Sequence, residues 1–77
     1  MKAKNPALEK LGQNVRRLRE AQKLTQESLA EKAEMDSTYI SGIERGVRNC
    51  SVLSLLRVAN ALGVVPGKLL EGVLVQD

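Results

Sequence analysis

The 77-residue sequence predicts an all-α fold, a compact bundle of five short helices within a single domain. Three observations support this class. Apolar residues recur at helical spacing along most of the chain. Residues that cap helices precede these segments, and glycines follow two of them. No segment is interpreted as a β-strand, a repeat or a linker, so residues 1–77 are expected to fold as one unit with a basic arm at residues 1–5.

The first helix is predicted over residues 6–22. Asn5 can cap it, and Pro6 suits the first helical position. Its apolar face holds Leu8, Leu11, Val15 and Leu18. Thr25 is the candidate cap of a second helix over residues 26–33. The apolar face of this second helix holds Leu29, Ala30 and Ala33.

A third helix follows a tight turn at Glu34 and Met35. Asp36 caps it, and Gly46 ends it, as a C-terminal glycine commonly does. The residues expected to lie inward or partly inward are Ile40, Ile43 and Tyr39, the only aromatic residue in the chain.

A fourth helix is capped by Ser51 and ended by Gly63. The face that we expect to lie inward holds Leu55, Leu56, Ala59 and Leu62. Pro66 opens a short fifth helix that runs through Glu71, and residues 72–77 form a tail.

Composition argues against several classes of function. The chain has one cysteine, Cys50, and no histidine, so it can form neither an internal disulfide nor a zinc site. It lacks a run of about 18 apolar residues that could span a membrane and the apolar centre of a signal peptide. With the free thiol, these features predict a cytoplasmic protein. A glycine-rich phosphate loop and a metal-ligand cluster are missing too, so we expect no enzyme and no cofactor. In so short a chain we infer no pocket for a small-molecule effector.

The net charge of +3 is unevenly distributed. Residues 1–23 carry seven Lys or Arg against two acids, whereas residues 24–47 carry two against five. A basic first segment can attract a polyanion by long-range steering. A solvated helix face with ordinary lysines would have the same composition, so charge alone leaves both interpretations open.

The second and third helices are separated by a turn of about three residues. This is the pattern of a helix-turn-helix, whose second helix can enter the major groove of DNA. Short helix pairs also occur in proteins that bind no nucleic acid, so the spacing by itself leaves DNA binding open.

Three motifs make the pattern more specific, namely "LTQESLA", "YISGIERG" and "LLRVANALGV" in that order. From Leu11 to Leu70 the chain resembles the Cro/cI-type (XRE-like) helix-turn-helix transcriptional regulators. Within that family, "STYISGIERGVRN" is similar to the controller proteins of restriction-modification systems. The resemblance implies a lambda-repressor-like domain that binds a palindromic site on double-stranded DNA as a homodimer, with the third helix in the major groove.

The resemblance also implies which residues read bases. These are on the early, exposed face of the third helix: Ser37, Thr38, Ser41 and Gly42. Hydroxyls can bond to several bases, but none offers the bidentate pairing of arginine with guanine. Ordinary solubility is the alternative explanation for three hydroxyls on a helix.

A second set is implied to contact the phosphate backbone: Gln26, Tyr39, Arg45, Arg48, Asn49, Arg16 and Arg17. Gln26 opens the second helix, where free amides and the positive end of the helix dipole favour an anion. Arginines give fork-shaped, charge-assisted contacts to phosphate. For Tyr39, a boundary position satisfied by water is the alternative.

Glu44 is not expected to face DNA, because the phosphates would repel its charge. The resemblance implies instead a partly buried ion pair with Arg19 of the first helix. The chain departs from the family pattern at two positions. Glu34 stands where glycine is usual, which costs about 1 kcal/mol if the residue is left-handed. Cys50 stands where proline is common, which loosens the entry to the fourth helix.

Residues 52–75 contain more aliphatic side chains than one helix face can bury. The surplus would form an apolar patch on a monomer, and such a patch usually marks an interface. We expect a dimer through the fourth and fifth helices, with an interface of Val52, Leu53, Leu56, Val64, Val65, Leu69 and Val73. The alternative is a well-filled core with a loose tail.

The function predicted from these features is that of a sequence-specific transcriptional regulator. The alternative is a protein-interaction module, an antitoxin or adaptor with weak or absent DNA binding, which an uncharged recognition face would suit.

Overall fold

The computed structural model describes residues 5–75, so the expected arm falls outside it apart from Asn5, as do residues 76–77 of the tail. This part of the chain contains no strand and five helices: α1 (Pro6–Ala21), α2 (Gln26–Ala33), α3 (Ser37–Glu44), α4 (Val52–Leu62) and α5 (Pro66–Leu69). The all-α class is therefore confirmed. α2 has the predicted bounds, whereas α5 ends two residues earlier than predicted.

Side-chain caps begin four of the helices, as the sequence predicts. Each cap accepts a hydrogen bond from a backbone N–H two or three residues later, and the four are Asn5, Thr25, Asp36 and Ser51. α4 ends at Gly63, whose φ is +69°. α3 ends at Glu44, and the left-handed Gly46 follows two residues later with φ +75°. Local sequence therefore sets the start of four helices and the end of two.

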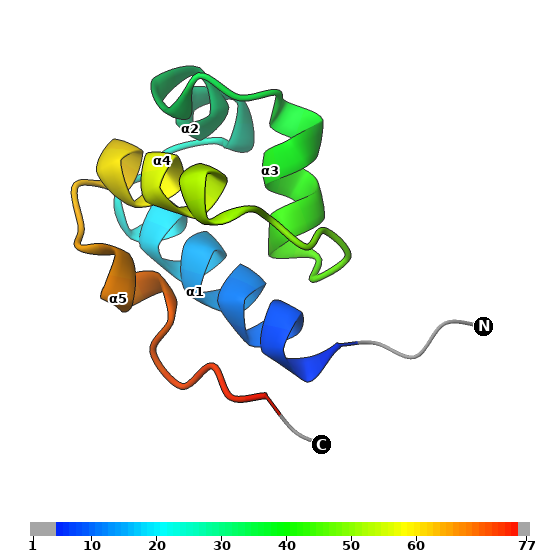
Figure 1. Cartoon of the computed structure of the whole chain (residues 1–77). Coiled ribbons are helices and arrows are strands. Elements are labelled where there is room, and N and C mark those ends of the chain that lie inside the picture. The colour runs from blue at the N-terminus through cyan, green and yellow to red at the C-terminus, as the bar shows by residue number, and fades with distance from the viewer. Residues whose placement is uncertain (1–4, 76–77) are drawn as a thin grey trace.

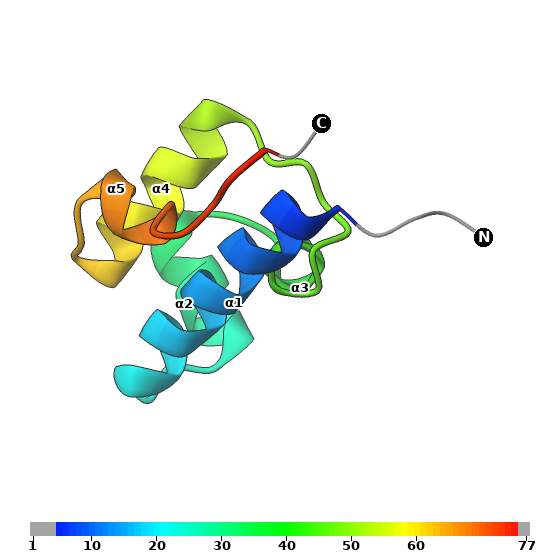
Figure 2. The same ribbon diagram turned by 90° about the horizontal axis from the view of Figure 1, so that it is seen from below.

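The helices pack around α1, which has α3 on one side and α5 on the other (Figures 1 and 2). α2 packs on α3 and α4, and α4 packs on α5. No other helix lies outside α3 in Figure 1, so one side of α3 is not covered by the bundle. No helix within residues 5–75 has the length and apolar character needed to cross a membrane.

The core draws on every helix. Its buried members are Leu11, Val15, Leu29, Ala30, Ile40, Ile43, Val58, Ala59, Leu62 and Leu69. The predicted inward face of α4 was wrong at Leu56, which is 43% exposed, because Val58 lies in the core instead. Val58 shares one face of the helix with Leu55 and Leu62, whereas Leu56 is rotated from Leu55 by about 100°.

α1 and α3 meet at a very close approach. A Cβ atom on Gly12 would lie 2.5 Å from the carbonyl oxygen of Glu44 and would also collide with that of Ile43. Only glycine therefore allows the end of α3 to lie directly on α1. This contact places the last turn of α3 beside the middle of α1.

Two amide side chains tie the C-terminal part of the chain to α1. Nδ2 of the buried Asn14 donates to the carbonyl oxygens of Leu69 (2.8 Å) and Glu71 (2.9 Å). Nε2 of Gln22 donates to the carbonyl oxygen of Leu62 at 2.6 Å. Because carbonyls at helix ends lack intrahelical partners, these bonds satisfy the ends of α4 and α5.

The turn between α2 and α3 is strained at Glu34. Its φ of 57° and ψ of 47° place it in the left-handed region, as the sequence comparison with glycine suggested, and its side chain is exposed.

Glu34→Gly should raise the free energy of unfolding by about 0.5–1 kcal/mol, because relief of the Cβ penalty exceeds the added entropy of the unfolded chain. Thermal unfolding followed by circular dichroism measures this.

The matched control is Glu31→Gly, at an exposed position inside α2. Here glycine should lower stability by about 1 kcal/mol, because the backbone is already helical. Equal destabilisation by both substitutions would contradict the assignment of strain to Glu34.

Candidate nucleic-acid interface

The start of α3 is built around Asp36. Oδ1 of Asp36 accepts the backbone N–H of Thr38 at 2.8 Å and the hydroxyl of Thr38 at 2.6 Å. The hydroxyl bond first, and the backbone bond second, lower the pKa of the Asp36 carboxyl. A lowered pKa means that this cap stabilises the fold above the unfolded-state pKa and loses its effect as the pH falls through the folded-state value. At neutral pH the cap is ionised and holds Thr38 in place.

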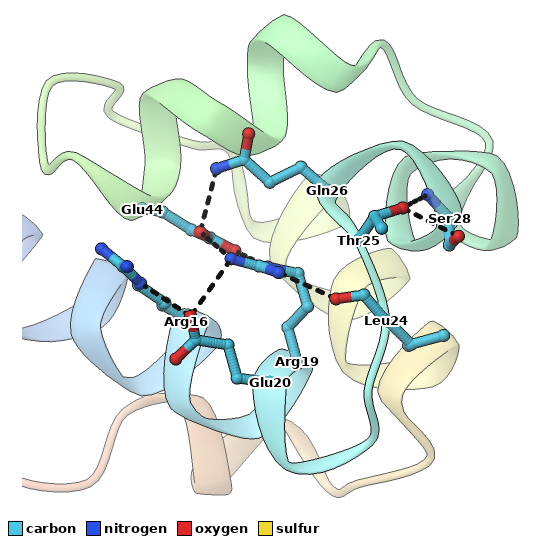
Figure 3. A network of polar contacts seen from close by, with 8 residues as sticks. All are labelled: Arg16, Arg19, Glu20, Leu24, Thr25, Gln26, Ser28 and Glu44. Atoms are coloured by element: carbon cyan, nitrogen blue, oxygen red, sulfur yellow. Dashed lines mark hydrogen bonds and ion pairs between the residues drawn. The ribbon is translucent and has the colours of Figure 1, made fainter.

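The C-terminal end of α3 is anchored by the expected ion pair. Arg19 donates from Nε to Oε2 of Glu44 at 2.7 Å and from Nη2 to Oε1 at 3.0 Å (Figure 3). The Glu44 side chain is 3% exposed and that of Arg19 11%. The hydrogen bond that Arg19 donates to Glu44 is the main cause that raises the pKa of Arg19. Arg19 also donates to the carbonyl oxygen of Leu24 at 2.8 Å, so it holds the loop before α2.

Gln26, expected to contact phosphate, has an intramolecular partner. Its Nε2 donates to Oε1 of Glu44 at 3.0 Å, which links the start of α2 to the end of α3. The sequence pattern did not reveal this bond, because the two residues are 18 positions apart and the pairing depends on how α2 and α3 pack. The feature of the sequence that could have indicated this bond was Glu44 itself, because a buried carboxylate has more acceptor sites than one arginine fills.

The outer side of α3 carries the three predicted hydroxyls. Thr38 is exposed, whereas Ser37 and Ser41 are half-buried. Nε of Arg45 donates to Oγ of Ser41 at 3.3 Å. Thr38 therefore donates its hydroxyl proton to Asp36. The Ser41 hydroxyl oxygen instead accepts a hydrogen bond from Arg45, which leaves the Ser41 hydroxyl proton to donate to another group.

The prediction that Gly42 lies on the exposed face of α3 was wrong. The residue is buried, because the segment after α3 folds back over it: the backbone N–H groups of Val47 and Arg48 both donate to its carbonyl oxygen, at 3.0 and 3.2 Å. A Cβ atom on Gly42 would lie 3.3 Å from Cβ of Arg48. Gly42 thus leaves room for Arg48 to lie across α3.

Arg48 occupies the space that Gly42 leaves. Its Cζ atom lies 4.8 Å from the centroid of the half-buried Tyr39 ring, at a distance suited to a cation–π contact. Arg45, Arg48 and Asn49 are all exposed. The structure therefore brings cationic groups to the same side of α3 as its hydroxyls.

The two arginines of α1 that were predicted to contact phosphate, Arg16 and Arg17, point in different directions. Arg16 follows Gly12 by four residues and pairs with Glu20 at 3.2 Å, near the Arg19–Glu44 pair (Figure 3). Arg17 is rotated by roughly 140° from Gly12 around the helix axis. Because Gly12 faces α3, Arg17 lies on a different side of α1 from the other candidate residues.

The predicted interface on α4 and α5 is only partly exposed. Val52, Leu53, Leu56 and Val65 are 73, 60, 43 and 73% exposed. Val64 and Val73 pack partly against the core. Leu69 is fully buried within the monomer, so its assignment to an interface was wrong. Three exposed aliphatic residues near the C-terminus were missed: Leu70, Leu74 and Val75.

Cys50 is half-buried, and desolvation raises the pKa of its thiol. A raised pKa favours the protonated thiol, whereas reactive cysteines need the thiolate. Residues 5–75 contain no group of three or more His, Cys, Asp or Glu that could hold a metal ion.

Known proteins share both the sequence pattern and the fold. The family model described as "Helix-turn-helix" (HTH_3) matches residues 15–69. The control protein C.BamHI of Bacillus amyloliquefaciens is 44% identical over 61 residues, which cover 78% of this chain and 75% of that protein. The crystal structure of the restriction-modification controller protein C.AhdI from Aeromonas hydrophila is 45% identical, with a TM-score of 0.80 over 80% of this chain and 94% of that one. A structure of C.Esp1396I bound to a 19 base pair DNA duplex is 38% identical, with a TM-score of 0.77 over 84% and 87% of the two chains.

Loss of the Glu44 carboxylate should destabilise the fold strongly. Glu44→Ala leaves the largely buried Arg19 without its partner, and we expect the free energy of unfolding to fall by about 3 kcal/mol. Chemical denaturation measures the change. The matched control is Glu20→Ala, because Glu20 is also an acid beside Arg19 but its side chain is 53% exposed; we expect a loss of at most about 0.5 kcal/mol. Similar losses in the two variants would refute a scaffold role for Glu44.

Proposed function

The chain belongs to the helix-turn-helix family of DNA-binding transcriptional regulators, and on that premise we propose that it binds a specific DNA site with α3 in the major groove. The observation that carries the proposal is the polarity of α3. Its polar side faces outward beside Arg45 and Arg48, while the only acid within the helix, Glu44, is buried against Arg19. A duplex can therefore approach α3 without meeting a negative side chain from within the helix. The protein would act by binding rather than by catalysis.

The hydroxyl groups of Thr38 and Ser41 are complementary, because one is left to accept a hydrogen bond and the other to donate one. Thr38 has used its hydroxyl proton on Asp36, so its oxygen is left to accept from the amino group of cytosine or adenine, and its methyl group can meet that of thymine. Ser41 accepts from Arg45 and keeps its proton, so it can donate to N7 or O6 of a purine. Ser37 completes the face at the first position of the helix.

Arg48 supplies the bidentate donor that the hydroxyls lack. Its guanidinium lies along α3 toward Tyr39, three residues before Gly42 and nearer the N-terminal end of the helix. In helix-turn-helix proteins this end of the recognition helix contacts base edges. We therefore assign Arg48 to guanine at the edge of the groove, a closer role than the phosphate contact that the sequence suggested.

The remaining contacts position the protein on the phosphate backbone. Arg45 and Asn49 follow α3, Gln26 opens α2, and Arg16 lies on the α3 side of α1. The hydroxyl of Tyr39 belongs to the same set. Such contacts set register and orientation but carry little sequence information. Arg17 is left out of the interface because of its direction.

We expect the active form to be a homodimer that joins copies through α4, α5 and the following segment. The exposed aliphatics Val52, Leu53, Leu56 and Val65, with Leu70 and Leu74, support this. α1 separates α3 from α5, so pairing there would leave α3 free (Figure 1). Two recognition helices about 34 Å apart would match one turn of DNA and a palindromic site.

A titration of pooled duplex DNA over a salt series tests the function. The logarithm of the binding constant should fall by about 0.9 per unit of log salt for each phosphate neutralised. Arg45→Gln should reduce this slope by about 0.9, because one cation is lost from the interface. The matched control Arg17→Gln should leave the slope unchanged. Absent or salt-insensitive binding by the wild type would favour the protein-interaction module instead.

Sedimentation at micromolar concentration tests the dimer. The wild type should sediment at twice the chain mass of 8.4 kDa. Leu53→Glu should give monomers, because it places a charge within the apolar patch at a side chain that is 60% exposed. The control Val47→Glu alters a valine that is 67% exposed on the loop after α3 and should leave the dimer intact. A wild type found only as 8.4 kDa species would exclude the dimer.

A further inference from the structure

The Glu44 carboxylate has one bond more than its ion pair requires. Arg19 donates to both carboxylate oxygens, at 2.7 and 3.0 Å, and Gln26 adds a third bond of 3.0 Å to Oε1. The side chain of Glu44 is only 3% exposed, so water does not readily replace this donor. The third bond comes from the first residue of the helix that precedes α3.

This bond determines which way the amide of Gln26 points. The nitrogen of a glutamine amide has two protons to donate, whereas its oxygen only accepts. A carboxylate therefore selects the nitrogen, because the reversed amide would bring two acceptors together. Figure 3 shows the side chain extending from the start of α2, with its nitrogen toward Glu44 and its oxygen away. One N–H of Nε2 is bound, and the other is available.

The position of Gln26 makes its orientation useful. The first N–H groups of an α-helix lack intrahelical partners, and the dipole places partial positive charge there. Thr25 takes the N–H of Ser28, which leaves those of Gln26 and Glu27 for an incoming anion. An amide N–H held beside them would add a donor to the same anion.

A carboxylate this close to a phosphate would normally oppose binding. Here Arg19 offsets the charge of Glu44 through two hydrogen bonds, so the group of Arg19, Glu44 and Gln26 carries no net charge. Glu44 can therefore hold the amide without adding net negative charge beside the duplex.

We infer that Glu44 is a positioning residue for DNA binding, in addition to its role in the scaffold: it orients the amide of Gln26 toward a DNA phosphate and so couples that contact to the placement of α3. The inference rests on the proposed function, since it concerns the same DNA-bound state. As a consequence, the phosphate-binding amide of Gln26 on α2 keeps a fixed position relative to α3, the helix that reads bases.

A double-mutant cycle on DNA affinity tests the inference. The variants are Gln26→Met, which keeps the side-chain length but not the donor, Glu44→Gln, and the two combined. Gln26→Met should weaken binding about tenfold, as expected for the loss of one hydrogen bond to a charged phosphate. Its salt slope should equal that of the wild type, because no cation is lost.

The cost of Glu44→Gln should be about fivefold greater with Gln26 present than in the Gln26→Met background, since the positioning effect requires the amide. The change in charge is common to both backgrounds and cancels in the cycle. Each variant is measured below its own unfolding transition, because Glu44→Gln also weakens the scaffold.

A second readout needs no DNA. In ¹⁵N NMR spectra of the free protein, the side-chain amide of Gln26 should be ordered, whereas that of Gln13, which is exposed on α1, should be mobile. In Glu44→Gln the Gln26 amide should become as mobile as that of Gln13. If Glu44→Gln does not fold, a mobile Gln26 amide in the wild type or an unchanged DNA affinity of Gln26→Met would still overturn the inference.

The outcomes separate the two ideas. Wild-type binding with unchanged affinity for Gln26→Met, equal costs of Glu44→Gln in both backgrounds, or a mobile Gln26 amide in the wild type would each overturn the positioning role and leave the proposed function standing. A wild type that binds no duplex fails at the first titration, and the inference fails with the proposed function.

Discussion

The bidentate pair between Arg19 and Glu44 is the interaction on which the rest of the arrangement depends. It joins the end of α1 to the end of α3, and each partner makes a second contact, to Leu24 and Gln26 respectively. The end of α1, the loop before α2 and the start of α2 are thereby held against the end of α3, which is 18 or more residues away in sequence. The pair is possible only because Gly12 lets the carbonyls of Ile43 and Glu44 lie against α1. A buried ion pair adds little stability compared with apolar residues of the same volume. Breaking the pair leaves a buried charge without a partner, so its main effect is to make one arrangement of the helices much more stable than the alternatives.

This constraint also sets the character of the exposed side of α3. Turning Glu44 inward removes the helix's only acid from the surface, and the segment that follows can fold back so that Arg48 lies over Gly42 and Tyr39. The lone aromatic residue therefore has a specific role: its ring covers part of the core and supports a cation on its outer face. The polar side of α3 is a composite surface, because part of it comes from the loop after the helix.

The molecule separates its two proposed surfaces by means of α1. The polar side of α3 lies on one side of α1, whereas α5 lies on the other (Figure 2). Asn14 holds the end of α5, and Gln22 holds the end of α4. Exposed aliphatics on α4 and near the C-terminus are thus held by a rigid core, although the chain is short. A dimer through these residues would add the apolar burial that a small domain lacks by itself. Binding and assembly would then use different sides of a single core.

Sequence alone determined the features that depend on neighbours along the chain. Four caps and the bounds of α2 were predictable, because each depends on residues within about one helical turn. The resemblance marked Glu34 only as a position where glycine is usual, and the structure decided that it is left-handed. The family motifs added the Arg19–Glu44 pair, which the structure contains. Tertiary structure decided the rest: the burial of Gly42 under Arg48, the inward turn of Leu69, the exposure of Leu56, and the bond from Gln26 to Glu44 across 18 residues. Spacing shows which residues share a helix face, but only packing against other helices decides whether that face meets the core, a returning loop or solvent.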